Sequence, residues 1–516
     1  MHEALVMWHD ALSPEVEVEY LAGMRRLAAQ LAGRCFSKWS LFAGTGLSSR
    51  FMMALSDVLF HRYGLVLECD NSLYCENHEG KQEFIRQQHQ PRVLVDNVAL
   101  LAHDVVKNIA SSSSSAEQEL LPFVVGMDAG IPCTSRTPLS SKSSSNLNCV
   151  QEQREATGLG WKAVHDTIQK HWPTVIGLEC VKQLGQKSGD DTSDADYILQ
   201  CLRSLGYWAH SDVLEALDFG APGPRERLYW GALRDVVGGH NVISMFFNKI
   251  LMGFKASVMW SAEDMFTMSV EARAEVAEAI GVPLNKEFGP RISKSTKDSQ
   301  NWKSDHKQMF DANGLPWPYL AEHGANVLDP SGLFAREIEA CWLAHSLFPP
   351  SAHDGLEFID INPQTTRLMQ PFLKEDMTVK ENAKGPEGRS PWREKLPTIV
   401  GSTRLVIRVT RMGASTVRLA ESFEMMRLIG WDDKQWARPN ASGMAMGVEG
   451  LDLISNMAGN AFSMWHFGPW QCALLSTYGQ FCKMEMDVEG VEEVQMSPQP
   501  AHSLISAASD SESLSS

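Results

Sequence analysis

Two side chains in the 516-residue sequence have the chemistry to form a bond with a substrate and to move its protons. Cys133 directly follows Pro132 at the predicted end of a strand, where a thiolate would be held rigidly toward a ligand cleft. Glu179 directly follows an apolar run at residues 175–178, and burial can keep such an acid protonated until it donates its proton. An inert, buried thiol is the common alternative for a single Cys, so the neighbouring residues must decide between the two interpretations.

Arg225 and Arg227 stand at alternate positions where the chain enters a predicted strand at residues 228–231. Because side chains alternate across a strand, the two guanidinium groups would point to the same side of the sheet. A binding role for this pair and a solvated, charged strand edge fit the pattern equally well.

A glycine-containing turn follows the first predicted strand, where residues 42–47 include Gly44 and Gly46. Glycine lets the backbone approach a ligand closely, as sites for nucleotide-like ligands require, although such turns are also common elsewhere. Acidic residues stand at the ends of the next two predicted strands, with Glu68 closing the second and Asp96 following the third. An acid in that position can bind the two hydroxyls of a ribose, whereas a solvated strand end is the simpler alternative.

Short apolar runs alternate with helical patterns over the first half of the chain and predict the strands that position these residues. The runs are 40–42, 64–68, 93–95, 123–126, 175–178 and 228–231. Strands separated by helices of this length form parallel βαβ units in an open, doubly wound sheet. Ligands of such sheets bind at the carboxyl ends of the strands, so we predict an α/β fold in which the candidate residues meet at that edge.

Composition and cysteine usage argue against several classes of protein. No run approaches the ~18–20 apolar residues that a transmembrane helix needs, and the N-terminus lacks the basic and apolar regions of a secretory signal. The ten Cys residues are scattered and form no CxxC pair, which indicates the reduced thiols of an intracellular protein without a zinc module. We therefore expect no membrane partner, no metal and an intracellular location.

The net charge of −17, from 46 basic and 63 acidic residues, argues against a polyanionic partner when it is taken as a single number. Its distribution weakens that interpretation. Residues 484–516 contain seven acids and no Lys or Arg, whereas residues 285–308 and 367–411 each carry a net excess of basic residues. A phosphate-contacting surface with stacking rings and a set of solvated loops with core rings both fit these two stretches. Tryptophans that lie in or near them are Trp302, Trp317 and Trp392.

The order of the candidate motifs along the chain is more specific than any one of them. Phe-x-Gly-x-Gly, Glu-x-Asp, Asp, Pro-Cys, Glu-x-Val and Arg-x-Arg occur in that order at residues 42–46, 68–70, 96, 132–133, 179–181 and 225–227. This series resembles the cytosine-C5 DNA methyltransferase family. Later segments agree with the family's last two conserved blocks, namely Arg418-Leu419, Glu424, Arg427-Leu428 and Gly430-Trp431-Asp432, and then Gly459-Asn460-Ala461.

The resemblance implies a Rossmann-like sheet that binds S-adenosylmethionine, together with a smaller target-recognition domain. A helix predicted over residues 14–33, with Ser13 as its cap, precedes that sheet. The implied organisation is an N-terminal helical extension (1–38), a catalytic S-adenosylmethionine-binding domain (39–235), a target-recognition domain (236–395), a return to the catalytic domain (396–483) and a disordered acidic tail (484–516).

The resemblance also implies a role for each candidate residue. Cys133 would add to C6 of cytosine, and Glu179 would bond N3 and the exocyclic amine. Arg225 would hold the base at O2, and Arg227 would support the loop that carries the Cys. The methyl group would pass to C5 of a cytosine flipped out of double-stranded DNA, in the nucleus if the source is eukaryotic. S-adenosylmethionine would contact Phe42, Gly44, Gly46, Leu47, Glu68, Asp96 and Asn460.

The chain departs from the family's usual pattern at positions that tune binding. Leu47 replaces a third Gly, Ser40 replaces an acid, Gly223 replaces a Gln, and Thr134 replaces the Gln after the catalytic Cys. Because the residues that do the chemistry are retained, activity is the expectation. Two alternatives stay open: the same chemistry on tRNA, which the segment at 134–136 disfavours, and a catalytically weak, regulatory member.

Overall fold

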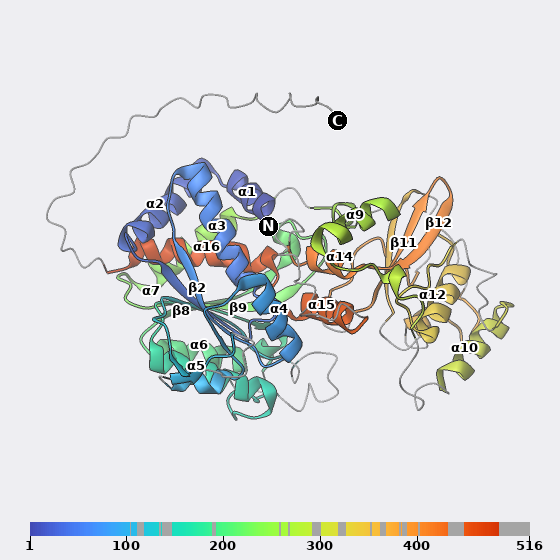
Figure 1. Cartoon of the computed structure of the whole chain (residues 1–516), viewed down its shortest axis with the longest axis horizontal. Coiled ribbons are helices and arrows are strands. Elements are labelled where there is room, and N and C mark those ends of the chain that lie inside the picture. Colours follow the sequence, from blue (N-terminus) through green and yellow to red (C-terminus); the bar gives the residue numbers. More distant parts are fainter. Residues whose placement is uncertain are drawn as a thin grey trace, which may run out of the picture. The chain divides into compact units, whose positions relative to one another are not determined.

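Figure 1 shows the computed structural model of the chain. Thr134, Ser135, Asp432 and the acidic tail, all part of the expectations above, lie outside the residues that the structure describes. The described residues are 1–103, 105–110, 118–133, 136, 147–187, 192–256, 260–266, 269–291, 301–317, 327–350, 353–361, 368–380, 383, 390–400, 403–431 and 448–483.

A seven-stranded sheet organises the first half of the chain, in the order β3-β2-β1-β6-β7-β9-β8. Strands β1, β2, β3, β6 and β7 run parallel, whereas β9 pairs antiparallel with both β7 and β8. The predicted α/β class is confirmed, and β9 makes the sheet mixed rather than wholly parallel. The strands are β1 (Phe36–Leu41), β2 (Cys69–Cys75), β3 (Val93–Val95), β6 (Gly126–Gly130), β7 (Val175–Val181), β8 (Trp208–Glu215) and β9 (Glu226–Leu233).

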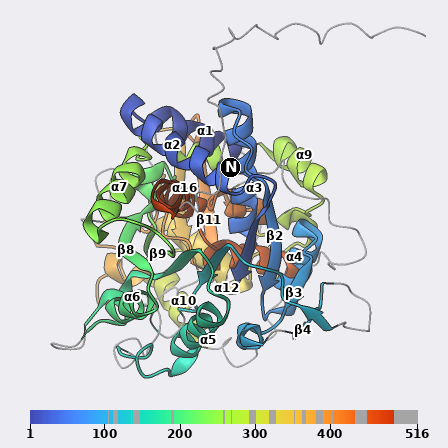
Figure 2. The same cartoon turned by 90° about the vertical axis from the view of Figure 1, so that its left-hand side faces the viewer.

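Helices cover both faces of this sheet (Figures 1 and 2). Helices α1, α2, α3, α7 and α16 share one hydrophobic core, and α5 and α6 share a second. Every residue of β7 is buried between these layers, as is typical of a central strand in a sheet covered on both faces. The helices are α1 (His2–Ala11), α2 (Pro14–Gln30), α3 (Leu47–Tyr63), α4 (Glu79–His89), η1 (Val98–Ala102), α5 (Glu155–His171), η3 (Lys182–Gly185), α6 (Asp194–Ser204), η4 (Ala216–Phe219), α7 (His240–Gly253) and α16 (Met464–Phe481).

The strands predicted at 93–95, 175–178 and 228–231 agree with β3, β7 and β9, whereas two other strands were predicted at the wrong residues. The second strand was expected at 64–68, but Gly64 ends α3 in the left-handed conformation and residues 65–68 lead into β2. The fourth was expected at 123–126, whereas β6 begins at Gly126. Its sequence includes Asp128, a charge that is tolerated in the interior because it pairs with the buried Lys38. Strand β8 was not predicted.

The helix predicted at 14–33 is confirmed as α2, and Ser13 Oγ accepts a hydrogen bond from Val16 N (3.4 Å). Helix α2 crosses α16 at small residues. A Cβ on Gly23 would lie 2.2 Å from Ser476 O, and a Cβ on Gly479 would lie 2.0 Å from Gly23 O. The two helix backbones therefore touch, and α2 packs directly on the last helix of the sheet's helical layer.

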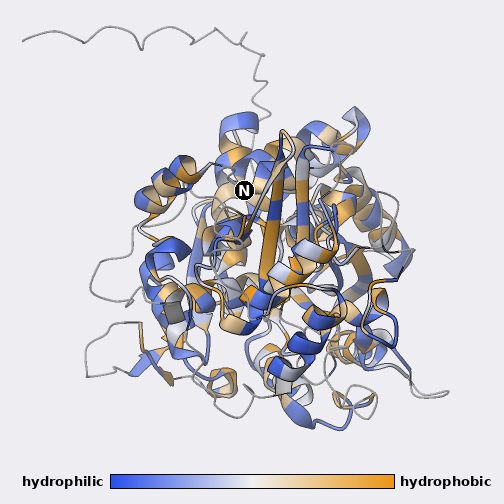
Figure 3. Cartoon of the chain, turned by 90° about the vertical axis from the view of Figure 1, so that its right-hand side faces the viewer, coloured by the Kyte–Doolittle hydropathy of each residue, from blue (hydrophilic) through white to orange (hydrophobic). Residues whose placement is uncertain are grey.

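Between β9 and α16 lies an insert with its own antiparallel sheet, in the order β10-β11-β12, and its own hydrophobic core. Figure 3 shows the chain from the side on which β11 and β12 lie in Figure 1. In the described part of the chain, no helix has the length and apolarity needed to cross a membrane. The remaining elements are β4 (Val105–Lys107), β5 (Gln118–Leu120), α8 (Ala262–Met265), α9 (Val270–Ile280), η5 (Asn285–Glu287), α10 (Asn301–Ala312), α12 (Ala335–Leu347), β10 (Gly355–Asp360), η6 (Gln370–Phe372), β11 (Leu405–Arg411), β12 (Ala414–Leu419), α14 (Ser422–Arg427) and α15 (Val448–Asn460).

Candidate active site

The register of the sheet brings the ends of four parallel strands to one edge. Leu41 at the end of β1 pairs with Cys75 at the end of β2 and with Ala129 of β6. Gly130, the last residue of β6, pairs with Glu179 near the end of β7. The glycine turn, the Cys133 segment and Glu179 therefore meet at this edge, as parallel α/β sheets place their ligand sites.

Cys133 lies half-buried just beyond β6, and its segment is tied to β7. The amide of Ile131 donates a hydrogen bond to Glu179 O (3.0 Å). Burial raises the pKa of the Cys133 thiol and the carboxylate of Glu179 adds to this rise, while the charges of Arg227 and Arg225 lower it. The thiol is thus held in a pocket where neighbouring cations can stabilise its thiolate.

Glu179 and Arg227 form a buried ion pair across β7 and β9. The antiparallel register places Val181 opposite Arg227, so that the Arg side chain reaches back to Glu179, with 3.0 Å between Nε and Oε1. Burial raises the pKa of Glu179, and Arg227 and Arg225 oppose the rise. Burial thus favours the protonated form of Glu179 and the ion pair favours its carboxylate.

Arg225 lies beside this pair, but its guanidinium group is occupied by backbone. It donates to Ile399 O (2.8 Å), Gly459 O (3.2 Å) and Ala461 O (2.8 Å). Burial lowers the pKa of Arg225 to about 10. The structure thus brings Arg225 and Arg227 together as predicted, while Arg227 makes the direct contact with the candidate acid.

The turn after β1 is left-handed at Phe42 (φ 51°), Gly44 (φ 56°) and Gly46 (φ 68°). A Cβ on Gly46 would lie 2.3 Å from Nε2 of the half-buried His89, so Gly is required there. Gly44 is buried, but a Cβ there would meet only Phe42 O, at 3.9 Å. Leu47, in contrast, points into the hydrophobic core and brings no side chain to this turn.

Glu68 is not at the predicted edge, and its place there belongs to Glu76. The carbonyl of Glu68 accepts a hydrogen bond from Phe36 N (2.7 Å) at the start of β1, so Glu68 lies at the opposite end of the strands. Glu76 directly follows β2 and is buried, and its Oε2 accepts a hydrogen bond from Gly44 N (2.9 Å). The signal for Glu76 was the short apolar run at residues 73–75, which ends β2.

Asp96 and Asn460 complete the predicted set. Asp96 directly follows β3 and is exposed, and Asn460 ends α15, where its Nδ2 donates to Asn456 Oδ1 (3.0 Å). Ser40, where the family usually has an acid, is buried and its Oγ lies 2.8 Å from Ser48 Oγ. This polar contact joins β1 to the first turn of α3 beneath the glycine turn.

Two residues that sequence reasoning missed, Arg136 and Asp194, bind the backbone near Cys133 and at residues 150–151. The Arg136 amide donates to Cys133 O (2.9 Å), and its buried guanidinium donates to Gln183 O. Asp194 accepts hydrogen bonds from Val150 N (3.2 Å) and Gln151 N (3.3 Å). Neither residue stands in a motif, because both act through backbone groups far away in the sequence.

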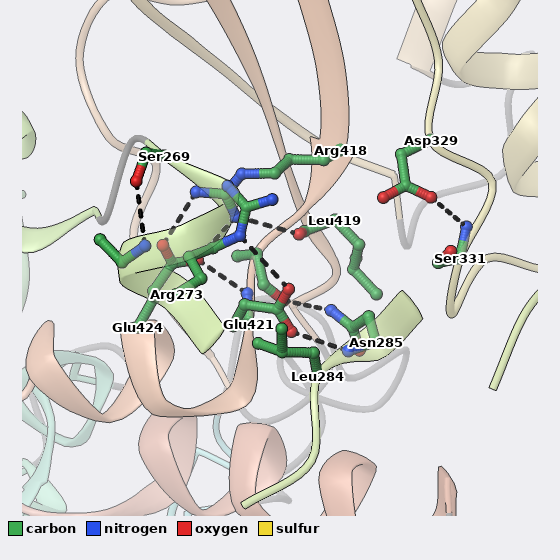
Figure 4. Close-up of polar contacts among 12 residues, drawn as sticks. Ser269, Arg273, Leu284, Asn285, Asp329, Ser331, Arg418, Leu419, Glu421 and Glu424 are labelled. Carbon is green, nitrogen blue, oxygen red and sulfur yellow. Dashed lines mark hydrogen bonds and ion pairs between the residues drawn. The ribbon is translucent and has the colours of Figure 1, made fainter. Parts of the chain in front are cut away.

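The block with Arg418 and Glu424 is a buried polar junction rather than a chemical site (Figure 4). Arg418 donates to both carboxylate oxygens of Glu424, at 2.7 and 2.8 Å. Glu421 accepts a hydrogen bond from Asn285 N (2.9 Å), and burial raises the pKa of Glu421 to about 7. Arg273 lies 3.7 Å from Glu421. These contacts join the segment after β12 to α9 and η5 of the insert.

Some side chains of the two basic stretches, at residues 285–308 and 367–411, are buried. Arg408 is fully buried and paired with Glu357, and its guanidinium stacks 4.4 Å from the centroid of the buried Trp392. Of the two interpretations left open for Trp392, the structure therefore agrees with the core ring and not with a ring for stacking on nucleic acid. Trp302 and Trp317 are partly exposed.

Comparison with known proteins agrees with this geometry. The seven-stranded mixed sheet is typical of S-adenosylmethionine-dependent methyltransferases. Residues 104–306 match the model of the C-5 cytosine-specific DNA methylase family. None of the curated proteins compared matches the chain.

Three solved structures are similar to the chain at low identity. The Dnmt2 methyltransferase of S. pombe is 13% identical, over 85% of this chain and 98% of that one, with a TM-score of 0.37. The Entamoeba histolytica methyltransferase EhMeth is 10% identical over 86% and 98%, with a TM-score of 0.40. A putative DNA modification methyltransferase encoded within an E. coli prophage is 12% identical over 86% and 98%, with a TM-score of 0.41.

Proposed function

We propose that the chain transfers a methyl group from S-adenosylmethionine to C5 of cytosine in double-stranded DNA. The observation that carries this proposal is the convergence of Cys133, Glu179 and Arg227 at the carboxyl edge of the sheet, where the glycine turn after β1 also lies. C5 of cytosine is a weak nucleophile, and this set of a thiol, an acid and a cation is what its activation requires.

The residues can activate the ring in one step. Cys133 Sγ forms a bond to C6 while Glu179 donates a proton to N3, so that the electron pair of the C5–C6 double bond becomes available at C5. Once C5 carries the methyl group, N3 returns its proton to Glu179 and solvent takes the C5 proton. The electron pair of that C–H bond re-forms the C5–C6 double bond as the Sγ–C6 bond breaks and releases the Cys133 thiolate. Since the target atom is enclosed in a duplex, the base must first leave the stack.

The two arginines exchange the roles that the family resemblance implies. Arg227 contacts Glu179 directly, so it is placed to orient the acid and to meet the base. Arg225 donates to three backbone carbonyls, which commits it to holding the segments around Ile399 and Gly459. We assign the contact with the base to Arg227 and the supporting role to Arg225.

The residues at the turn suit S-adenosylmethionine, which supplies the methyl group when it is bound. Gly44 brings no side chain to the turn, Glu76 holds the turn through Gly44 N, and Asp96 and Asn460 are exposed. We assign the contact with the ribose to Glu76 in place of Glu68, because an acid at the end of the second strand is suited to bind paired hydroxyls.

The decisive experiment compares wild type with Cys133→Ser, using labelled S-adenosylmethionine and either duplex DNA or tRNA. Cys201→Ser is the matched control, since that half-buried thiol lies on α6, outside the site. We expect transfer to DNA by the wild type and the control and none by Cys133→Ser. Transfer to tRNA alone would overturn the substrate, and no transfer to either would overturn the enzyme in favour of a regulatory role.

A covalent trap tests the mechanism separately. DNA that contains 5-fluorocytosine has no C5 proton to lose, so the Sγ–C6 bond should persist and the complex should survive denaturing electrophoresis. The complex should require both Cys133 and the methyl donor. A trapped complex that forms equally well with Cys133→Ser would contradict the assigned nucleophile.

A further inference from the structure

Helix α15 contacts the insert near its beginning and the candidate active site at its end. Asp452 receives ion pairs from two arginines of the insert and its boundary: Arg291 Nη1 lies 2.5 Å from Oδ2, and Arg404 Nη1 lies 3.1 Å from Oδ1. Seven residues later, Gly459 O accepts a hydrogen bond from Arg225. At a rise of about 1.5 Å per residue, roughly 10 Å of helix joins the two contacts.

The two arginines that hold Asp452 belong to the framework of the insert. Arg404 also donates to both carboxylate oxygens of Glu337 on α12, at 3.1 and 2.8 Å, and to Gly332 O at 2.7 Å. The guanidinium groups of Arg291 and Arg404 lie 5.3 and 5.5 Å from the ring centroid of Phe334. Asp452 is thus bound to fixed groups, not to flexible surface side chains.

The C-terminal end of α15 is linked through Arg225 to Ile399, which lies close to Arg404 in the sequence. Arg225 donates to Gly459 O and Ala461 O, and it also donates to Ile399 O, five residues before Arg404. Arg225 thus binds Ile399 and the end of α15, while Arg404 binds Asp452 near the start of the same helix. Within this set of contacts, a displacement of the insert relative to α15 is opposed by the ion pairs of Asp452.

We infer that Asp452 is a positioning residue that couples the insert to the methyl-transfer pocket; this inference rests on the proposed function for its catalytic part. The Asp452 side chain is 47% exposed, so its ion pairs are moderate in strength and can be lost without unfolding the chain. Its loss would leave the insert able to bind nucleic acid but would loosen the register between the insert and the pocket that receives the base.

The test uses Asp452→Asn, the conservative variant Asp452→Glu, and Asp57→Asn as a matched control. Asp57 is an exposed carboxylate on α3, outside the contacts described above. Hydrogen exchange is measured on the full chain without substrate. We expect exchange of backbone amides at 403–411 and 455–461 to become roughly fivefold faster in Asp452→Asn, with little change in the other two variants.

Transfer kinetics give the second readout, expressed per S-adenosylmethionine-binding site. In Asp452→Asn, kcat should fall roughly fivefold, while the Kd for DNA should change less than about twofold. Asp452→Glu should restore kcat. Arg404→Gln combined with Asp452→Asn should lower kcat by less than the product of the two single effects, because both changes remove the Arg404–Asp452 pair.

Three results would overturn the inference: exchange in Asp452→Asn that matches Asp57→Asn, a loss that falls on DNA affinity alone, or additive effects in the double variant. If the wild type transfers no methyl group to any nucleic acid, the proposed function fails by itself. The exchange measurement then still decides whether Asp452 couples the insert to α15.

Discussion

The paired substitutions Arg225→Lys and Arg227→Lys should separate a structural arginine from a catalytic one. The Arg225 side chain is buried, and three backbone carbonyls depend on it at 2.8, 3.2 and 2.8 Å. One ammonium group cannot reach three acceptors that surround a planar guanidinium, so about two charge-assisted hydrogen bonds are lost. At about 1.5–3 kcal/mol for each such bond, the free energy of unfolding should fall by about 3–6 kcal/mol.

Arg227→Lys should have the opposite profile. A Lys can still pair with Glu179, and Arg227 donates otherwise only to Glu226 O (2.8 Å) among its described contacts, so stability should change by less than about 1 kcal/mol. Its fork geometry toward a base is lost, and kcat should fall by about two orders of magnitude. Chemical denaturation and single-turnover transfer are the two assays. A stable but inactive Arg225→Lys, together with an unstable Arg227→Lys, would refute the exchange of roles.

Three other perturbations test separate parts of the site. Glu76→Gln should weaken S-adenosylmethionine binding about tenfold by calorimetry, while Glu68→Gln should leave it unchanged; the reverse result would restore the original ribose assignment. Because the carboxylate of Glu179 raises the pKa of Cys133, Glu179→Gln should lower that pKa and make alkylation of the thiol at pH 8 faster, which a rate profile from pH 7 to 10 would show. Lys38→Met should cost about 3–5 kcal/mol of unfolding free energy, because it leaves the partner carboxylate buried and unpaired; a change below about 1 kcal/mol would contradict that.

Strand ends were predictable from the sequence where the strand itself is apolar. Residues 175–178 of β7 are a continuous apolar run, so the position of Glu179 near the end of that strand follows from the local pattern. β2 has Asp70 and Asn71 near its start and its apolar part is short, while the more apolar stretch at 65–67 belongs to the exit from α3. Because that stretch is apolar, the second strand was predicted there, and Glu68 at its end was expected to bind the ribose.

Contacts between distant segments carried no signal in the sequence. Arg225 donates to carbonyls that are 174, 234 and 236 residues away, and these acceptors are backbone groups that any residue type supplies. Asp194 and Arg136 likewise act on backbone amides and carbonyls. A motif records side-chain chemistry at fixed spacing, so it can indicate which residues react but not which ones hold the walls of the pocket.

The distribution of charge along the sequence likewise does not show which basic side chains are free to bind a partner. The basic excess at 285–308 and 367–411 suggested a phosphate-contacting face, yet three arginines in those stretches pair with carboxylates. Arg404 and Arg408 pair with Glu337 and Glu357 of the insert, and Arg291 pairs with Asp452 of α15. The exposed cations that remain there are mostly lysines: Lys286, Lys303, Lys307, Lys374, Arg393, Lys395 and Arg411. Lys contacts phosphate as a point charge without the planar fork of Arg, so these residues favour attraction over sequence discrimination. These paired arginines thus hold the insert in place, and the exposed lysines are available to attract the nucleic acid of the proposed function. Discrimination between target sequences must then come from other groups of the insert, and the contribution of the exposed cations should decline steeply as salt is raised.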